Sequence, residues 1–105
     1  MEYISAVELD ELLKQNAPVD VLDVRENYEV GICKIDAIHI PMNEVVERYE
    51  EIPQDHKVVV MCRTGKRAEA VANILFTEFG FSNISVLEGG IIEWIEKIDN
   101  QLEIY

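Results

Sequence analysis

The sequence predicts an α/β protein in which helices cover both faces of a mainly parallel sheet. The first observation is that strand signals and helix signals alternate along the whole chain. The second is the run Val58-Val59-Val60-Met61, which has no polar residue at alternate positions and therefore predicts a strand buried on both faces. A chain of 105 residues that is 49% hydrophobic has room for one core, so we expect a single domain over residues 1–105.

The first half of the chain carries signals for three helices and two strands. Ser5 and Glu8 have the S-x-x-E spacing of a capping box, and leucines follow at helical spacing, so a first helix should end near Asn16. After an Ala-Pro break, residues 19–24 are expected to form a strand, and residues 38–40 form a short strand closed by proline. Two short helices are also expected, one beginning near Glu26 and one running from Asn43 to Tyr49.

The second half repeats the alternation. Apolar residues after the basic loop recur with the spacing of one helical face from Ala68 to Phe79, and Gly80 is expected to end that helix. Residues 84–87 predict a last strand. A Gly-Gly turn at 89–90 then leads to a final helix, whose buried face comprises Ile91, Trp94, Ile95 and Ile98.

The charge balance limits the possible partners. There are 9 basic and 21 acidic side chains, a net charge of −12, which disfavours nucleic acid and anionic membrane surfaces. No apolar run approaches the ~20 residues of a membrane helix, and the start Met1-Glu2 does not resemble a signal peptide, so we expect a cytoplasmic protein. Three of the basic residues fall between Arg63 and Arg67 and form a local positive spot in this acidic background.

Cys62 is the candidate nucleophile. It follows the buried strand directly, and ligands in parallel sheets bind beyond the carboxyl ends of the strands, where the next helix offers free N–H groups. The nearby cations Arg63, Lys66 and Arg67 and a helix N-terminus favour the thiolate form of a cysteine. The alternative is a small buried core cysteine with basic neighbours that merely face solvent.

The length of the loop limits the kinds of group that Cys62 can carry. Arg67 closes a C-x-x-x-x-R loop, whereas cysteine-dependent phosphatases use C-x-x-x-x-x-R, and Ala68 stands where that arginine would be needed. A shorter loop encloses less space, which suits one sulfur atom on Cys62 better than a tetrahedral oxyanion. The loop therefore argues against a phosphatase or an arsenate reductase.

The chain resembles the single-domain members of the rhodanese (sulfurtransferase) family. Residues 62–67 fit the family's C-R-x-G-x-R loop, residues 23–26 and 37–41 resemble its D-V-R-E and A-x-x-I-P stretches, and residues 87–90 with Trp94 resemble its G-G-x-x-x-W. The chain departs from the family at three places. Residues 32–34 are Ile-Cys-Lys and residue 36 is Asp, near where many members have Gly-His-Ile and then a Gly. Residue 68 is Ala, where members often have Ser.

The resemblance implies a rhodanese-like three-layer α/β/α sandwich with about five strands and no cofactor. It also implies a sulfurtransferase in which the Cys62 thiolate takes sulfur from a small anionic donor such as thiosulfate and passes it to a thiol or cyanide. The alternative is a persulfide carrier or binding module fed by a protein donor, for which the acidic surface would suit a basic partner.

The same resemblance suggests roles for the loop residues. Backbone N–H groups of the loop residues would stabilise the persulfide, while Arg63 and Lys66 orient the donor. Arg67 would brace the loop against Asp23. The loop positions concerned are Arg63, Thr64, Gly65, Lys66 and Arg67.

Five other residues either have two interpretations or are expected to be structural. Asp23 either pairs with Arg67 or caps the helix near Glu26, and Arg25 is expected to support the structure around the loop. Cys33 either packs under the loop or resolves a persulfide on Cys62, and packing is favoured. The two histidines, His39 and His56, are expected to be structural or exposed, and the two Cys and two His lack the spacing of a metal site.

Overall fold

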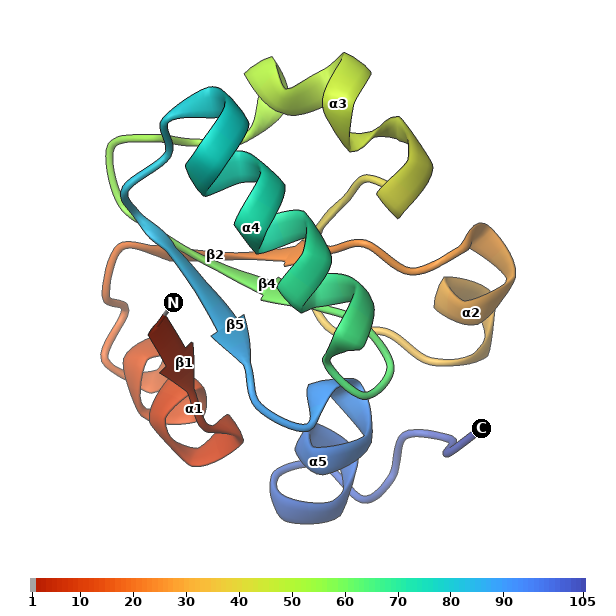
Figure 1. Ribbon diagram of the computed structural model, residues 1–105. Helices are drawn as coiled ribbons and strands as arrows, with labels where there is room; N and C mark the ends of the chain where they lie inside the picture. The colour runs from red at the N-terminus through yellow and green to blue at the C-terminus, as the bar shows by residue number, and fades with distance from the viewer. Residues whose placement is uncertain (1) are drawn as a thin grey trace.

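A computed structural model describes residues 2–105 and shows a five-stranded sheet in which every strand pair is parallel (Figure 1). The strand order is β1-β5-β4-β2-β3, so β4 lies in the middle of the sheet. The strands are β1 (Glu2–Ile4), β2 (Val19–Asp23), β3 (Ile38–His39), β4 (Lys57–Met61) and β5 (Ile84–Leu87). The expected α/β architecture and the four expected strands are confirmed. The edge strand β1 was not predicted, because three residues that pair only with β5 carry no periodic signal.

Helices cover both faces of the sheet and make three layers. The helices are α1 (Ala6–Lys14), α2 (Asn27–Ile32), α3 (Val45–Arg48), α4 (Lys66–Phe79) and α5 (Gly90–Lys97), with 3-10 turns η1 (Met42–Glu44) and η2 (Tyr49–Glu51) beside α3. Figure 1 shows α4 lying across one face, and α1 contacts α5 on the other. Among residues 2–105, none of the helices has both the length and the apolar composition needed to cross a bilayer.

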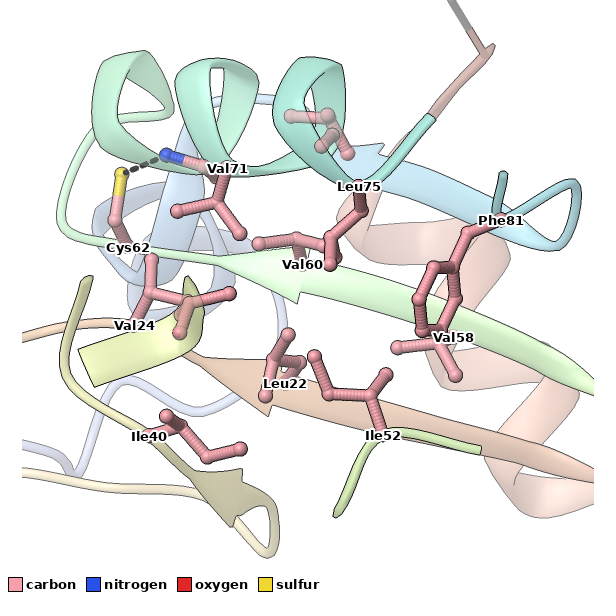
Figure 2. Close-up of a cluster of buried hydrophobic side chains, with 14 residues drawn as sticks. Leu22, Val24, Ile40, Ile52, Val58, Val60, Cys62, Val71, Leu75 and Phe81 are labelled. Carbon is pink, nitrogen blue, oxygen red and sulfur yellow. Dashed lines mark hydrogen bonds between the residues drawn. The ribbon is translucent and has the colours of Figure 1, made fainter. Parts of the chain in front are cut away.

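Strand β4 contributes to both hydrophobic clusters. Val58 and Val60 pack with residues of α4 such as Leu75 on one face (Figure 2), and Val59 and Met61 pack with α1 and α5 on the other. Each of these four β4 side chains is 0% exposed, as the unbroken apolar run predicted. Burial of this strand on both faces fixes where its carboxyl end lies, and therefore where Cys62 lies.

The predicted helices agree with the structure except for one. The capping box of Ser5 and Glu8 starts α1, and Gly80 ends α4 in a left-handed conformation. The stretch expected as one helix from Asn43 to Tyr49 is instead a short α-helix between two 3-10 turns. Val46 in this stretch is exposed, so only Val45 and Tyr49 of the expected apolar face pack against the core.

Candidate functional site

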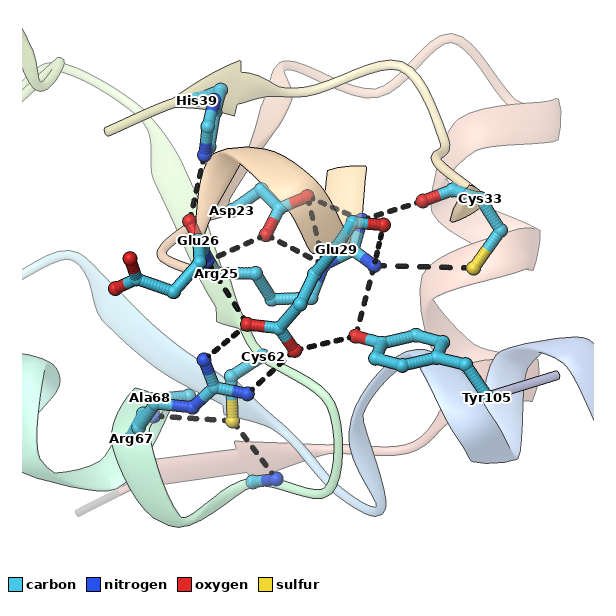
Figure 3. A network of polar contacts seen from close by, with 11 residues as sticks. Asp23, Arg25, Glu26, Glu29, Cys33, His39, Cys62, Arg67, Ala68 and Tyr105 are labelled. Atoms are coloured by element: carbon cyan, nitrogen blue, oxygen red, sulfur yellow. Dashed lines mark hydrogen bonds and ion pairs between the residues drawn. The ribbon is translucent and has the colours of Figure 1, made fainter. Parts of the chain in front are cut away.

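The loop after β4 encloses the sulfur of Cys62. The Cys62 side chain is 1% exposed, and its Sγ accepts hydrogen bonds from the backbone N–H groups of Gly65 at 3.0 Å and Ala68 at 3.4 Å (Figure 3). The Ala68 N–H belongs to the first turn of α4, where backbone donors have no partner inside the helix. Two backbone N–H groups and the positive end of the α4 dipole therefore face the sulfur.

Backbone conformation explains how so short a loop closes. Gly65 has φ 119°, in the left-handed region that glycine adopts without strain, and it forms the N-cap of α4. The start of α5 holds the other side of the loop, because Ile91 N–H donates to Cys62 O at 2.9 Å and Ile92 N–H donates to Arg63 O at 3.2 Å. A Cβ at Gly90 would overlap the main chain of Cys62 and Arg63, so the Gly-Gly turn permits this close approach.

Arg67 is paired with Glu29 and not with Asp23 as expected. Arg67 Nη1 and Nη2 lie 2.6 and 2.9 Å from Glu29 Oε1 and Oε2, in a bidentate pair (Figure 3). The Glu29 side chain is only 3% exposed, and the hydrogen bonds from Arg67 outweigh burial and lower the pKa of Glu29 to about 2. Glu29 in turn raises the pKa of Arg67. The carboxylate that holds Arg67 therefore comes from helix α2 and not from the end of β2.

Asp23 is instead paired with Arg25. Arg25 Nε lies 3.0 Å from Asp23 Oδ1, and Arg25 Nη2 lies 2.8 Å from Oδ2. The correction has a simple cause, since Arg25 is two residues along the chain and its side chain folds back onto the carboxylate within the protein interior. Burial alone would lower the pKa of Arg25, but its bonds to Asp23 and Tyr105 raise it.

Arg25 connects this pair to helix α2. Its Nη2 donates to Cys33 O at 2.8 Å and its Nη1 donates to Glu29 O at 3.3 Å, so one guanidinium bonds backbone carbonyls of the last turn and the C-cap of α2. These bonds fix the helix that carries Glu29, which holds Arg67. Asp23 and Arg25 are therefore linked to Arg67 of the loop through α2 and Glu29.

Tyr105 completes the polar network formed by Asp23, Arg25, Glu29, Arg67 and Tyr105 (Figure 3). Its hydroxyl donates to Glu29 Oε2 at 2.8 Å and accepts from Arg25 Nη1 at 3.1 Å. Burial and the bond to Glu29 raise the pKa of Tyr105 to about 12, although Arg25 opposes the shift. The phenol therefore stays protonated and keeps donating to Glu29 at neutral pH.

Sequence reasoning missed two members of this network. Glu29 had a detectable signal, because Glu26 and Glu29 have the reciprocal spacing of a capping box, and Glu26 N–H does donate to Glu29 Oε1 at 3.0 Å. Tyr105 had none, since its partners Arg25 and Glu29 are far away in sequence.

The other loop cations differ in exposure. Lys66 and Thr64 are exposed, whereas Arg63 is half-buried. Arg63 Nη2 donates to the main-chain oxygen of Tyr105, and the guanidinium carbon lies 5.0 Å from the centroid of the Tyr105 ring. Lys66 is therefore the loop cation that most readily meets a solute.

The remaining cysteine and the histidines lie in structural surroundings. Cys33 is buried in the apolar cluster beside α1 and α5, with its Sγ 3.9 Å from Arg25 Nη1, and both cysteines are free thiols. His39 Nε2 lies 2.7 Å from Arg25 O, and His56 pairs with acidic residues near the start of β4. Within residues 2–105, no three His, Cys, Asp or Glu side chains are grouped to hold a metal ion.

The comparisons of sequence and of structure with known proteins agree with one another. Residues 5–97 match the Rhodanese-like domain family. YtwF of Bacillus subtilis, which is named as a sulfurtransferase, is 36% identical over 95 residues that cover 90% of each chain. MoeZ of Mycobacterium tuberculosis, named as an adenylyltransferase/sulfurtransferase, is 31% identical over 97% of this chain, which spans only 26% of MoeZ.

The structural comparison covers about as much of the chain as the sequence comparisons do. The crystal structure of a rhodanese-related protein from Thermoplasma volcanium superposes with a TM-score of 0.83 at 36% identity and covers 93% of this chain and 94% of its own. The sequence match, the shared fold and the loop around Cys62 lead to one conclusion. This chain belongs to the Rhodanese-like domain family.

Proposed function

We propose that this chain is a sulfurtransferase that carries sulfane sulfur as a persulfide on Cys62. The observation that carries the proposal is the Cys62 sulfur at the carboxyl end of β4, within hydrogen-bond reach of two backbone N–H groups. The names of YtwF and MoeZ support sulfur transfer as the general activity. We propose a small anionic donor such as thiosulfate and a thiol or cyanide as the acceptor.

The reaction has two displacement steps. The Cys62 thiolate attacks the outer sulfur of thiosulfate, so that a new S–S bond forms while the S–S bond of thiosulfate breaks and sulfite leaves with the electron pair. The acceptor thiolate or cyanide then attacks the terminal sulfur of the persulfide, and Cys62 departs as a thiolate. The N–H groups of Gly65 and Ala68 already donate to Sγ, so they are placed to stabilise the anionic sulfur through both steps.

The cations have separate roles in this proposal. Lys66 is exposed and attracts the anionic donor, whereas Arg67 is held by Glu29 and keeps the loop closed around the sulfur. Arg63, the loop residue directly after Cys62, provides a second contact for the donor once its own contacts with Tyr105 are broken.

A protein-fed persulfide carrier is the second candidate. The chain covers just 26% of MoeZ, so a domain of this kind also occurs as part of a longer protein. A carrier would accept sulfur from a protein persulfide faster than from thiosulfate. The net charge of −12 suits a basic protein donor.

Intact-mass measurement tests the proposal directly. The protein is weighed before and after thiosulfate, and again after cyanide, together with the variants Cys62→Ser and Cys33→Ser. We expect the wild type and Cys33→Ser to gain the mass of one sulfur atom and to lose it with cyanide, and we expect Cys62→Ser to gain nothing. If the wild type gains no sulfur from thiosulfate but gains it from a protein persulfide, the carrier is correct. Hydrolysis of an aryl phosphate without any sulfur gain would overturn both.

A further inference from the structure

We propose that Tyr105 is a specificity-determining residue that competes with anionic donors for Arg63. The inference rests on the proposed sulfur transfer for its biological meaning, but its geometry stands on observed contacts. Tyr105 lies in the segment after α5, and both its main-chain oxygen and its aromatic ring contact the Arg63 guanidinium. An anion that binds Arg63 through Nη2 or over the face of its guanidinium competes with these contacts.

The Tyr105 side chain is firmly anchored where it contacts Arg63. Its hydroxyl group bridges two buried side chains, since it donates to Glu29 and accepts from Arg25. The ring also packs against the hydrophobic cluster on the α1 and α5 face, together with Leu102 of the same segment. The segment is thus held by both polar and apolar contacts, and moving it away from Arg63 requires several of them to break.

The contacts with Tyr105 do not use all the hydrogen-bond donors of Arg63. Its Nε atom is buried and has no hydrogen-bond partner among the described residues. A buried unpaired N–H of a cation is costly, and an anionic oxygen is the partner that best satisfies it. Arg63 therefore has a contact with Tyr105 through Nη2 and an unused donor that an incoming anion would engage.

This competition distinguishes anionic from neutral reagents. An anion that displaces Tyr105 gains electrostatic attraction to Arg63, whereas a neutral molecule gains no comparable attraction from that cation. Tyr105 therefore reduces the advantage of small anionic donors. A donor with contacts of its own elsewhere on the protein is less affected, because it does not depend on Arg63 alone.

Two alkylating reagents of nearly equal size test the inference. Iodoacetate is anionic and iodoacetamide is neutral, and each transfers its carbon to the Cys62 thiolate with loss of iodide. The rates are measured in a Cys33→Ser background, so that only Cys62 reacts, for Tyr105→Ala and for Ile104→Ala, a matched change at a neighbouring exposed residue.

We expect Tyr105→Ala to raise the iodoacetate rate relative to the iodoacetamide rate by about tenfold, the size of a desolvated cation–π contact. Ile104→Ala should leave this ratio unchanged. Adding Arg63→Met to Tyr105→Ala should abolish the gain, because the cation that favours the anion is gone. An equal rise for both reagents would show that Tyr105 only blocks access, and no rise for either would show that Arg63 is already available; both results overturn the inference.

Tyr105→Phe is a second, milder variant that keeps the test valid if Tyr105→Ala does not fold. It keeps the ring on Arg63 and removes only the bonds to Glu29 and Arg25, so we expect an intermediate reagent ratio, about threefold above wild type. A ratio equal to that of the wild type in Tyr105→Phe would contradict the proposed anchoring.

Thiosulfate kinetics then connect the result to function. Tyr105→Ala should lower KM for thiosulfate relative to Ile104→Ala, because the anionic donor no longer competes with the Tyr105 ring for Arg63. If no variant forms a persulfide, the proposed function fails while the alkylation ratio still decides the role of Tyr105.

Discussion

The two ends of strands β2 and β4 carry similar ion pairs in different surroundings. At the carboxyl end, Arg25 and Asp23 pair with side chains that are 0% and 2% exposed. At the amino end, His56 pairs with Asp20 at 2.7 Å, and these side chains are 24% and 44% exposed. A buried charge depends on its partner, whereas an exposed charge exchanges its partner for water at little cost. The same kind of contact therefore determines structure at the site and contributes little at the opposite end.

The largest effect is expected from Asp23→Asn. The substitution leaves the buried Arg25 guanidinium without its counter-charge, which costs about 3 kcal/mol or more. The measurement is the free energy of unfolding from urea titration. Asp20→Asn is the matched control on the same strand and should change that free energy by less than about 1 kcal/mol. Equal effects of the two changes would contradict the distinction between the ends of the sheet.

A smaller loss of stability is expected from Glu29→Gln. Gln keeps the shape but removes the charge that holds Arg67, and Arg67 is 34% exposed and can turn toward water. We expect unfolding to become easier by about 1–3 kcal/mol. Persulfide formation on Cys62 should also slow, because the loop loses its brace. Glu2→Gln removes an exposed partner of Lys57 at the opposite end and serves as the control; a normal rate in Glu29→Gln would rule out the brace.

Lowering the pH should selectively remove the contribution of Glu29 to the free energy of unfolding. Its pKa falls from 4.5 to about 2 on folding, so its stabilising effect is fully present above 4.5 and is lost as the pH falls from 4.5 toward 2. The stability difference between wild type and Glu29→Gln should therefore be constant at neutral pH and shrink below about pH 4.5. A difference that persists unchanged to pH 2 would show that the charge of Glu29 is not responsible.

The smallest effect is expected at His56, and it has the opposite sign with pH. The hydrogen bond to Asp20 raises the pKa of His56 above its ordinary value of 6.5. The contribution of protonated His56 is therefore present below pH 6.5 and is lost as the pH rises through the raised pKa. NMR titration of the imidazole measures this pKa, and Asp20→Asn should lower it. A wild-type value at or below 6.5 would contradict the pairing.

The sequence predicted most of the fold because its signals are local. The apolar run of β4, the capping box at Ser5 and the helical spacing after Ala68 each lie within one element, and all three appear in the structure. Strand β1 and the broken helix around Val46 depend on neighbours that are distant in sequence. Local patterns do not contain that information.

The candidate site was predicted less completely for the same reason. The position of Cys62 and the two N–H donors follow from a strand, a short loop and a helix that are consecutive in sequence. The partner of Arg67 did not follow, because a carboxylate of the right charge was available at Asp23 as well as at Glu29. Only the packing of α2 decides between the two. Tyr105 was missed because its role depends wholly on where the segment after α5 folds.

The contact of Gly90 with the loop limits how this protein can be engineered. Ile91 and Ile92 donate to the carbonyls of Cys62 and Arg63, and the missing side chain of Gly90 leaves the space that these bonds need. Inserting one residue to enlarge the loop for a phosphate-sized group would move these carbonyls away from α5. A change of substrate class would therefore have to redesign the β5–α5 turn together with the loop, as one inseparable unit of sequence.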